Sequence, residues 1–70
     1  MSRESTILAA LSSEPTSTEA LYERMGYLTL VRLGLVSYPA FRAELVKLAA
    51  DGLIERETAR DGSTHWRLAS

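Results

Sequence analysis

The sequence predicts a mainly α-helical domain that ends in a small, two-stranded antiparallel β-hairpin. Three observations indicate this fold class. Apolar residues recur at helical spacing in three segments, and a fourth, more ambiguous segment brings the expected number of helices to three or four. Capping and stop signals separate these segments from one another. Near the end of the chain the pattern changes to alternation of apolar and polar side chains, which is typical of a half-buried strand.

The first helix is expected over residues 3–12. Ile7, Leu8 and Leu11 are expected on one face at helical spacing, and the Ser2 side chain can cap the helix N-terminus. Pro15 ends the segment, because the residue before a proline is disfavoured in the helical region.

The second helix is expected over residues 17–25. The sequence TSTE at 16–19 reads as a capping box, in which Thr16 caps the helix and Glu19 reaches back to the Thr16 amide. Leu21, Met25 and then Leu28 form its expected buried stripe. Gly26 is placed to adopt the left-handed conformation that closes a helix.

Residues 27–36 allow three interpretations. They form a short helix from Leu28 stopped by Gly34, a continuation of the second helix to Leu35, or a strand. Seven of the ten residues are hydrophobic, and their spacing favours a helix. An apolar segment of this kind is expected to pack on the core or on a partner.

A further helix is expected over residues 38–51. Pro39 suits a first helical turn, where its missing N–H costs nothing. Phe41, Leu45 and Leu48 form its buried stripe, and Gly52 follows its end.

The hairpin is expected within residues 53–68, with strands on either side of residues 59–63. A two-residue turn would place glutamates opposite Trp66 and Leu68. An odd loop of three or five residues instead places Ile54 and Arg56 on their face, so the hydrophobic pattern favours the odd loop. Trp66 then alternates in phase with Leu68 and is expected in the core.

Length and composition exclude several classes of protein. The chain has 70 residues, which predicts one domain, residues 1–70. The chain has no cysteine and only one histidine. This composition excludes a disulfide scaffold, a cysteine nucleophile and a multi-histidine metal site. No apolar run approaches the ~20 residues of a membrane helix and the N-terminus is polar, so we expect a cytoplasmic protein. No motif of catalysis is present, so we expect neither an enzyme nor a cofactor.

The order of the expected elements resembles that of a winged helix-turn-helix domain. The resemblance is carried by residues 41–54 (FRAELVKLAADGLI), which look like a recognition helix running into the first wing strand. Residues 61–62 (DG) and 65–68 (HWRL) then look like the wing tip and the return strand. Residues 26–37 depart from the family, because they are longer than its usual link between the second and third helices.

This resemblance implies binding of double-stranded DNA, as a transcriptional regulator does, with helix 38–51 in the major groove and the wing 53–68 along the backbone. Glu44 and Asp51 are expected on the outward face of the helix, where they would repel phosphates. A net charge of −1 is also low for a nucleic-acid-binding domain. The residues expected to contact DNA are Tyr38, Arg42, Lys47, Arg56, Arg60, His65 and Arg67.

An alternative is a protein-interaction or dimerisation module that does not bind DNA, since a fold does not determine its function. The apolar segment 27–36 would form its contact surface, with Tyr27, Leu30 and Leu33 at the interface. The partner would be a second copy of the chain or another protein.

Overall fold

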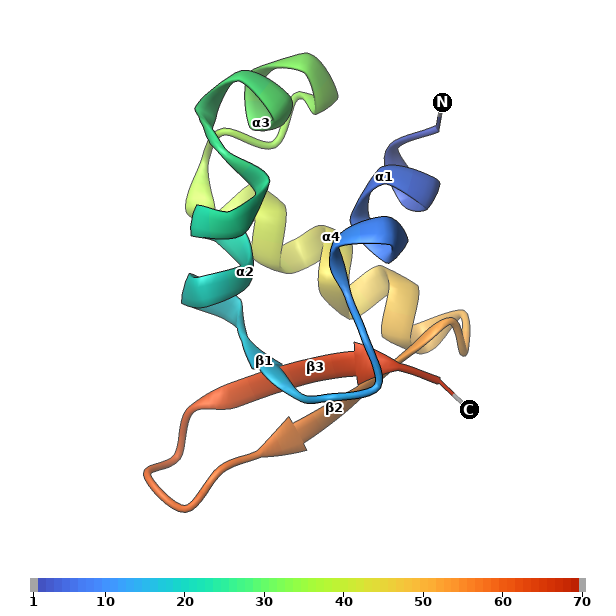
Figure 1. The fold of residues 1–70 in the computed structure, drawn as a ribbon, viewed down its shortest axis with the longest axis vertical. Coiled ribbons are helices and arrows are strands. Elements are labelled where there is room, and N and C mark those ends of the chain that lie inside the picture. Colours follow the sequence, from blue (N-terminus) through green and yellow to red (C-terminus); the bar gives the residue numbers. More distant parts are fainter. Residues whose placement is uncertain (1, 70) are drawn as a thin grey trace.

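The structure, a computed structural model, describes residues 2–69 and consists of four helices and a three-stranded antiparallel sheet (Figure 1). The helices lie on one side of the sheet in this view, and α3 lies at the end of the molecule farthest from the hairpin tip. The elements, in chain order, are α1 (Arg3–Ala10), β1 (Thr16–Ser17), α2 (Thr18–Met25), α3 (Tyr27–Leu33), α4 (Tyr38–Ala50), β2 (Ile54–Thr58) and β3 (Thr64–Leu68).

Helix α1 begins where the sequence predicts and ends earlier. The Ser2 hydroxyl oxygen accepts a hydrogen bond from the Ser5 amide at 3.1 Å, which confirms the predicted cap. The helix ends at Ala10, because Leu11 has extended backbone angles while its side chain still enters the core.

The predicted capping box of α2 is wrong by one residue. Ser17, not Thr16, caps the helix, and its side chain accepts from the Ala20 amide at 3.1 Å. Thr16 cannot serve as the cap because it is part of strand β1, where it pairs with Trp66.

The predicted two-stranded hairpin is present as β2 and β3, but the sheet has a third strand, β1, that the sequence did not predict. Strand β1 pairs antiparallel with β3, which places β3 between β1 and β2. A strand of two residues is too short to show a period-two pattern, and for that reason the sequence does not reveal it. The pairing of β1 with β3 brings the N-terminus of α2 alongside the hairpin.

The predicted register of the hairpin is confirmed. Ile54 pairs with Leu68 and Arg56 pairs with Trp66, and residues 59–63 form the odd loop between the strands. Gly62 has a φ of 86° in this loop, a conformation that L residues with a side chain rarely adopt.

Segment 27–36 contains the short helix α3, which confirms the first of the three interpretations. The helix stops at Gly34, whose φ of 74° and ψ of 25° lie in the left-handed region. Gly26 also has a positive φ, 83°, but its ψ of 152° turns the chain sharply between α2 and α3 instead of closing α2 with a left-handed cap.

Helix α4 matches its predicted start and stops one residue early. It begins at Tyr38 with Pro39 in its first turn and ends at Ala50, with Asp51 as its C-cap. Its predicted stripe is confirmed as core: Phe41, Leu45 and Leu48 are all buried.

The core lies between the helices and the sheet, and Trp66 joins the two. As predicted, Trp66 is fully buried, with 1% of its surface exposed. Its indole Nε1 donates to the Thr18 hydroxyl at 2.7 Å, so the polar atom of the ring is satisfied. The same hydroxyl donates to the Thr64 carbonyl at 3.4 Å, which ties the first residue of α2 to strand β3.

Within residues 2–69, none of the helices is long and apolar enough to cross a membrane.

Candidate nucleic-acid interface

The outward face of α4 carries two cations among small and apolar residues. Because the core stripe faces inward, helical geometry directs the remaining positions to solvent. This exposed α4 face consists of Arg42, Ala43, Val46, Lys47 and Ala50. Ala43 and Ala50 add little bulk on either side of the cations.

Glu44 does not belong to this outward face, which corrects the prediction. Its side chain is only 12% exposed, and its Oε1 lies 3.2 Å from Nη1 of Arg3. Helix α1 therefore neutralises the carboxylate that was expected to repel phosphates. Asp51 remains exposed, at the C-terminal end of α4.

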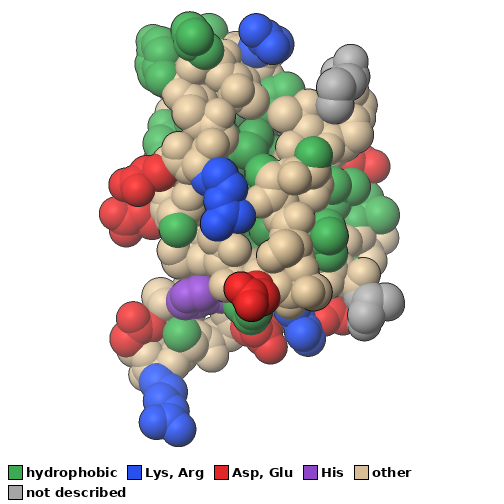
Figure 2. Space-filling view, viewed as in Figure 1, with side chains coloured by type: hydrophobic (Ala, Val, Ile, Leu, Met, Phe, Trp, Pro, Cys, Tyr) green, Lys and Arg blue, Asp and Glu red, His purple; other side chains and the backbone are tan. Residues whose placement is uncertain are grey.

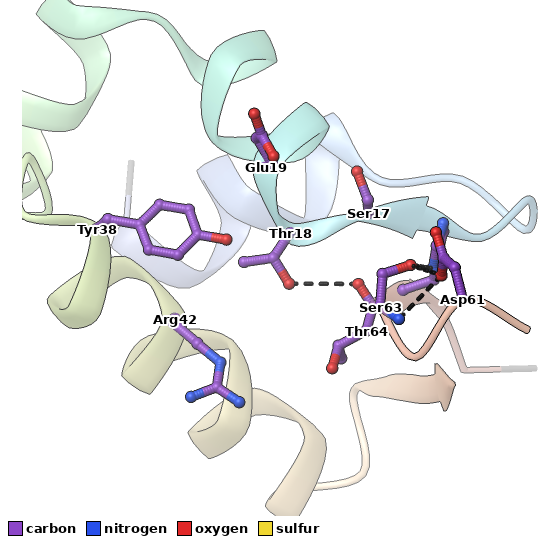
Figure 3. A pocket seen from close by; sticks show the side chains of 9 residues that line it. Ser17, Thr18, Glu19, Tyr38, Arg42, Asp61, Ser63 and Thr64 are labelled. Carbon is purple, nitrogen blue, oxygen red and sulfur yellow. Dashed lines mark hydrogen bonds between the residues drawn. The ribbon is translucent and has the colours of Figure 1, made fainter. Parts of the chain in front are cut away.

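A groove of about 660 Å³ lies where the N-termini of α4 and α2 approach the tip of the hairpin (Figure 3). It brings together three of the predicted contact residues, Tyr38, Arg42 and His65. Residues of α2 and β1 complete its wall, and the sequence could not place them there without knowledge of β1. These additional residues are Ser17, Thr18 and Glu19, and the hairpin adds Asp61, Ser63 and Thr64.

Hydrogen bonds order the hairpin tip beside this groove. A single carboxylate oxygen of Asp61 accepts from the Ser63 hydroxyl at 2.6 Å and from the Ser63 amide at 2.9 Å. The hydroxyl bond, followed by the amide bond, holds the pKa of the Asp61 carboxyl below its ordinary value of 3.8. The Ser63 hydroxyl also lies 3.4 Å from His65 Nδ1, so the three side chains form one polar cluster.

A second groove, of about 590 Å³, lies between the C-terminal half of α4 and the hairpin strands. It is lined by Arg56, by Arg67 and by Val46 of the exposed α4 face. Arg56 is exposed there and available to a ligand.

Arg67 is not available in the same way, and its predicted role is not supported by its surroundings. Its Nη2 lies 2.8 Å from Glu55 Oε1 and 3.8 Å from Glu57 Oε1. Glu55 is its direct cross-strand partner. The predicted hairpin register therefore also places Arg67 within ion-pair distance of two carboxylates of β2.

The two remaining predicted cations are exposed. Lys47 lies on α4, and Arg60 lies in the loop of the hairpin. Figure 2 shows a basic side chain at the far end of that hairpin. The cations that stay available along α4 and the hairpin are Arg42, Lys47, Arg56 and Arg60.

The predicted interface residues of segment 27–36 divide between core and surface. Leu30 is 2% exposed and belongs to the core, so its assignment to an interface is wrong. Leu33 is half-buried against the same core, whereas Tyr27 is exposed. Leu28 and Val31 are also exposed, so the prediction that Leu28 belongs to the buried stripe of the second helix is wrong. Helical spacing from Leu30 could have identified Leu28, because a residue two positions away lies on the opposite face of a helix.

The fold and the site together define a small α/β domain that presents a cationic helix face beside a hairpin. Comparisons with protein-family models, curated proteins and solved structures find no match to this chain. Within residues 2–69, no group of three or more His, Cys, Asp or Glu side chains is placed to hold a metal ion.

Proposed function

We propose that this protein binds double-stranded DNA through the exposed α4 face and the hairpin, in the manner of a winged helix-turn-helix regulator. The observation that carries the proposal is the chemistry of α4. Its outward face holds Arg42 and Lys47, and the acid expected between them, Glu44, is turned towards α1 and paired.

The shape of α4 supports this proposal. The major groove is ~12 Å wide and admits a single helix. With alanines at positions 43 and 50, the helix can approach the base edges closely. Arg42 suits a guanine edge, to which arginine donates two hydrogen bonds, and Lys47 suits a phosphate. Arg56 and Arg60 extend the same cationic track onto the hairpin.

The charges also bound the affinity. Glu19 and Asp61 line the first groove, and the net charge of the chain is −1. Four available cations replace at most about four counterions, which gives a salt slope near −3.6 on logarithmic axes. Affinity should therefore fall about 10²-fold between ~50 mM and ~200 mM salt.

An amide NMR titration with a mixed-sequence DNA duplex at these two salt concentrations tests the proposal. We expect shifts at residues 38–47 and 56–65 that fade at the higher concentration. The absence of shifts at both concentrations would contradict DNA binding and favour a protein-interaction module.

A pair of charge-matched variants tests the site. Arg42→Gln should weaken DNA binding by about fivefold to 10²-fold, as the loss of a base contact does. Arg24→Gln removes the same charge from α2, outside both grooves, and should weaken binding less than about twofold. Arg24 donates to the Ala10 carbonyl at 2.9 Å, and glutamine retains an N–H donor on a shorter side chain. Fluorescence anisotropy measures both affinities, and equal losses would contradict the assignment of the site to α4.

A further inference from the structure

The short helix α3 is apolar on both of its faces. Leu30 on its inner face fills the core. On its outer face, Tyr27 is 70% exposed, Leu28 is 77% exposed and Val31 is 49% exposed. An amphipathic surface helix would carry polar residues at these positions. Contiguous exposed apolar side chains of this kind indicate an interaction surface.

This α3 face, defined as Tyr27, Leu28, Val31 and Arg32, is separate from the candidate DNA interface. Figure 1 shows α3 at the opposite end of the molecule from the hairpin tip. Figure 2 shows apolar side chains gathered over that end. Neither groove beside α4 uses a residue of the α3 face, so both surfaces can be occupied at the same time.

Charges of opposite sign flank the apolar residues. Arg32 follows Leu28 by one helical turn and is exposed on the same side of α3. Glu23 lies on the last turn of α2, just before the α3 face begins, and is also exposed. A surface with an acid at one end and a base at the other is complementary to itself when turned by 180°.

We propose that the α3 face binds the α3 face of a second copy of this chain, with the two α3 helices antiparallel. In this arrangement Leu28 of one copy packs on Val31 of the other, and the reverse contact is identical by symmetry. Arg32 of each copy then lies opposite Tyr27 of the other, at the end of the apolar strip that is nearer to Glu23 of that other copy.

The extent of the surface fits this occupant. At ~200 Å² for a fully exposed large side chain, the three apolar residues leave about 400 Å² on each copy. A standard interface buries ~800 Å² per partner, so the three residues supply about half of that area and support only a weak, reversible dimer. Two seven-residue helices, each about 10 Å long, cover one another without a larger surface around them.

Sedimentation equilibrium without DNA tests the dimer, from about 20 μM to about 1 mM chain, the range for weak association. The wild type should change from monomer to dimer across this range. Leu28→Glu places two carboxylates in the apolar centre and should raise the dissociation constant at least about tenfold. Ala9→Glu adds the same charge at an exposed position of α1 and should leave it unchanged. A wild type that stays monomeric at the highest concentration, or a Leu28→Glu variant that dimerises normally, would overturn the proposal.

Charge reversal tests the antiparallel orientation. Arg32→Glu and Glu23→Arg should each weaken the dimer about fivefold, because each places like charges opposite one another. The double variant restores opposite charges across the interface, and its dissociation constant should return to the wild-type value. A double variant weaker than either single variant would overturn the antiparallel pairing. These measurements contain no nucleic acid, so their outcome is independent of the proposed DNA binding.

Discussion

The hairpin end and the α3 end of this molecule are anchored in similar ways and differ in the surface they present. At the hairpin end, Trp66 is inserted into the core and bonded to Thr18. At the α3 end, Leu30 is inserted into the core, and its carbonyl accepts from the Leu35 amide at 2.8 Å. Outside these anchors, the hairpin end is polar and carries arginines, whereas the α3 end is apolar. One small core thus supports two exteriors suited to chemically different partners.

The largest expected effect comes from the anchor of the hairpin end. Trp66→Ala should lower the free energy of unfolding by about 3–5 kcal/mol, because it leaves a large cavity between sheet and helices. The total free energy of unfolding of a domain of this size is roughly 4–10 kcal/mol, so the variant should be close to unfolded at 25 °C. Urea unfolding followed by far-ultraviolet circular dichroism measures this loss without the tryptophan signal.

Trp66→Phe serves as the control for this prediction. It keeps an aromatic ring in the core but removes the indole donor to Thr18. The free energy of unfolding should therefore fall by less, about 1–3 kcal/mol. If Trp66→Ala were nearly as stable as the wild type, the hairpin would not depend on this anchor, and the comparison between the two ends would fail.

The anchor of the α3 end should have the next largest effect. Leu30→Ala should lower the free energy of unfolding by about 2–5 kcal/mol, because Leu30 fills the core. The same substitution two residues earlier, on the opposite face of α3, is Leu28→Ala. It should change the free energy of unfolding by less than about 0.5 kcal/mol, since Leu28 is exposed. Thermal unfolding at low protein concentration, where the chain is monomeric, compares the two variants. Equal losses would show that the two faces of α3 do not differ as described.

The sequence predicted the hairpin better than the sheet that contains it. The register follows from side-chain alternation, because only an odd loop places Ile54 and Leu68 on one face. Strand β1 has no comparable signal. It is defined by its long-range pairing with β3, and its two residues are typical of a helix start. The error in the helix cap and the error in strand number therefore have the same cause.

Prediction of the candidate site was limited by pairing between distant residues. Periodicity correctly placed Lys47 on the outer face of α4, and Arg42, which was expected at the border of that face, is exposed on it as well. It could not show that Glu44 meets Arg3, which lies 41 residues earlier in the chain. The cross-strand pair of Arg67 and Glu55 was implied by the predicted register, since directly opposite residues interact. In that case the signal was present in the sequence, and counting cations without their partners overlooked it.

The smallest expected effect lies at the hairpin tip, and it tests whether that end is as ordered as its hydrogen bonds indicate. The Ser63 hydroxyl lowers the pKa of the Asp61 carboxyl from its ordinary value of 3.8. The hydrogen-bonded carboxylate should therefore stabilise the folded state fully above that pH. Its contribution should be lost as the pH falls through the lower pKa of the folded state. Ser63→Ala removes the hydroxyl and leaves the amide donor, so it should shift the Asp61 pKa part of the way back up. Carboxyl carbon NMR across the acidic range measures this shift directly. If the titration midpoint of Asp61 were the same in both proteins, the hairpin tip would sample many conformations in solution. The contrast between an ordered polar end and an apolar end would then rest on Trp66 alone.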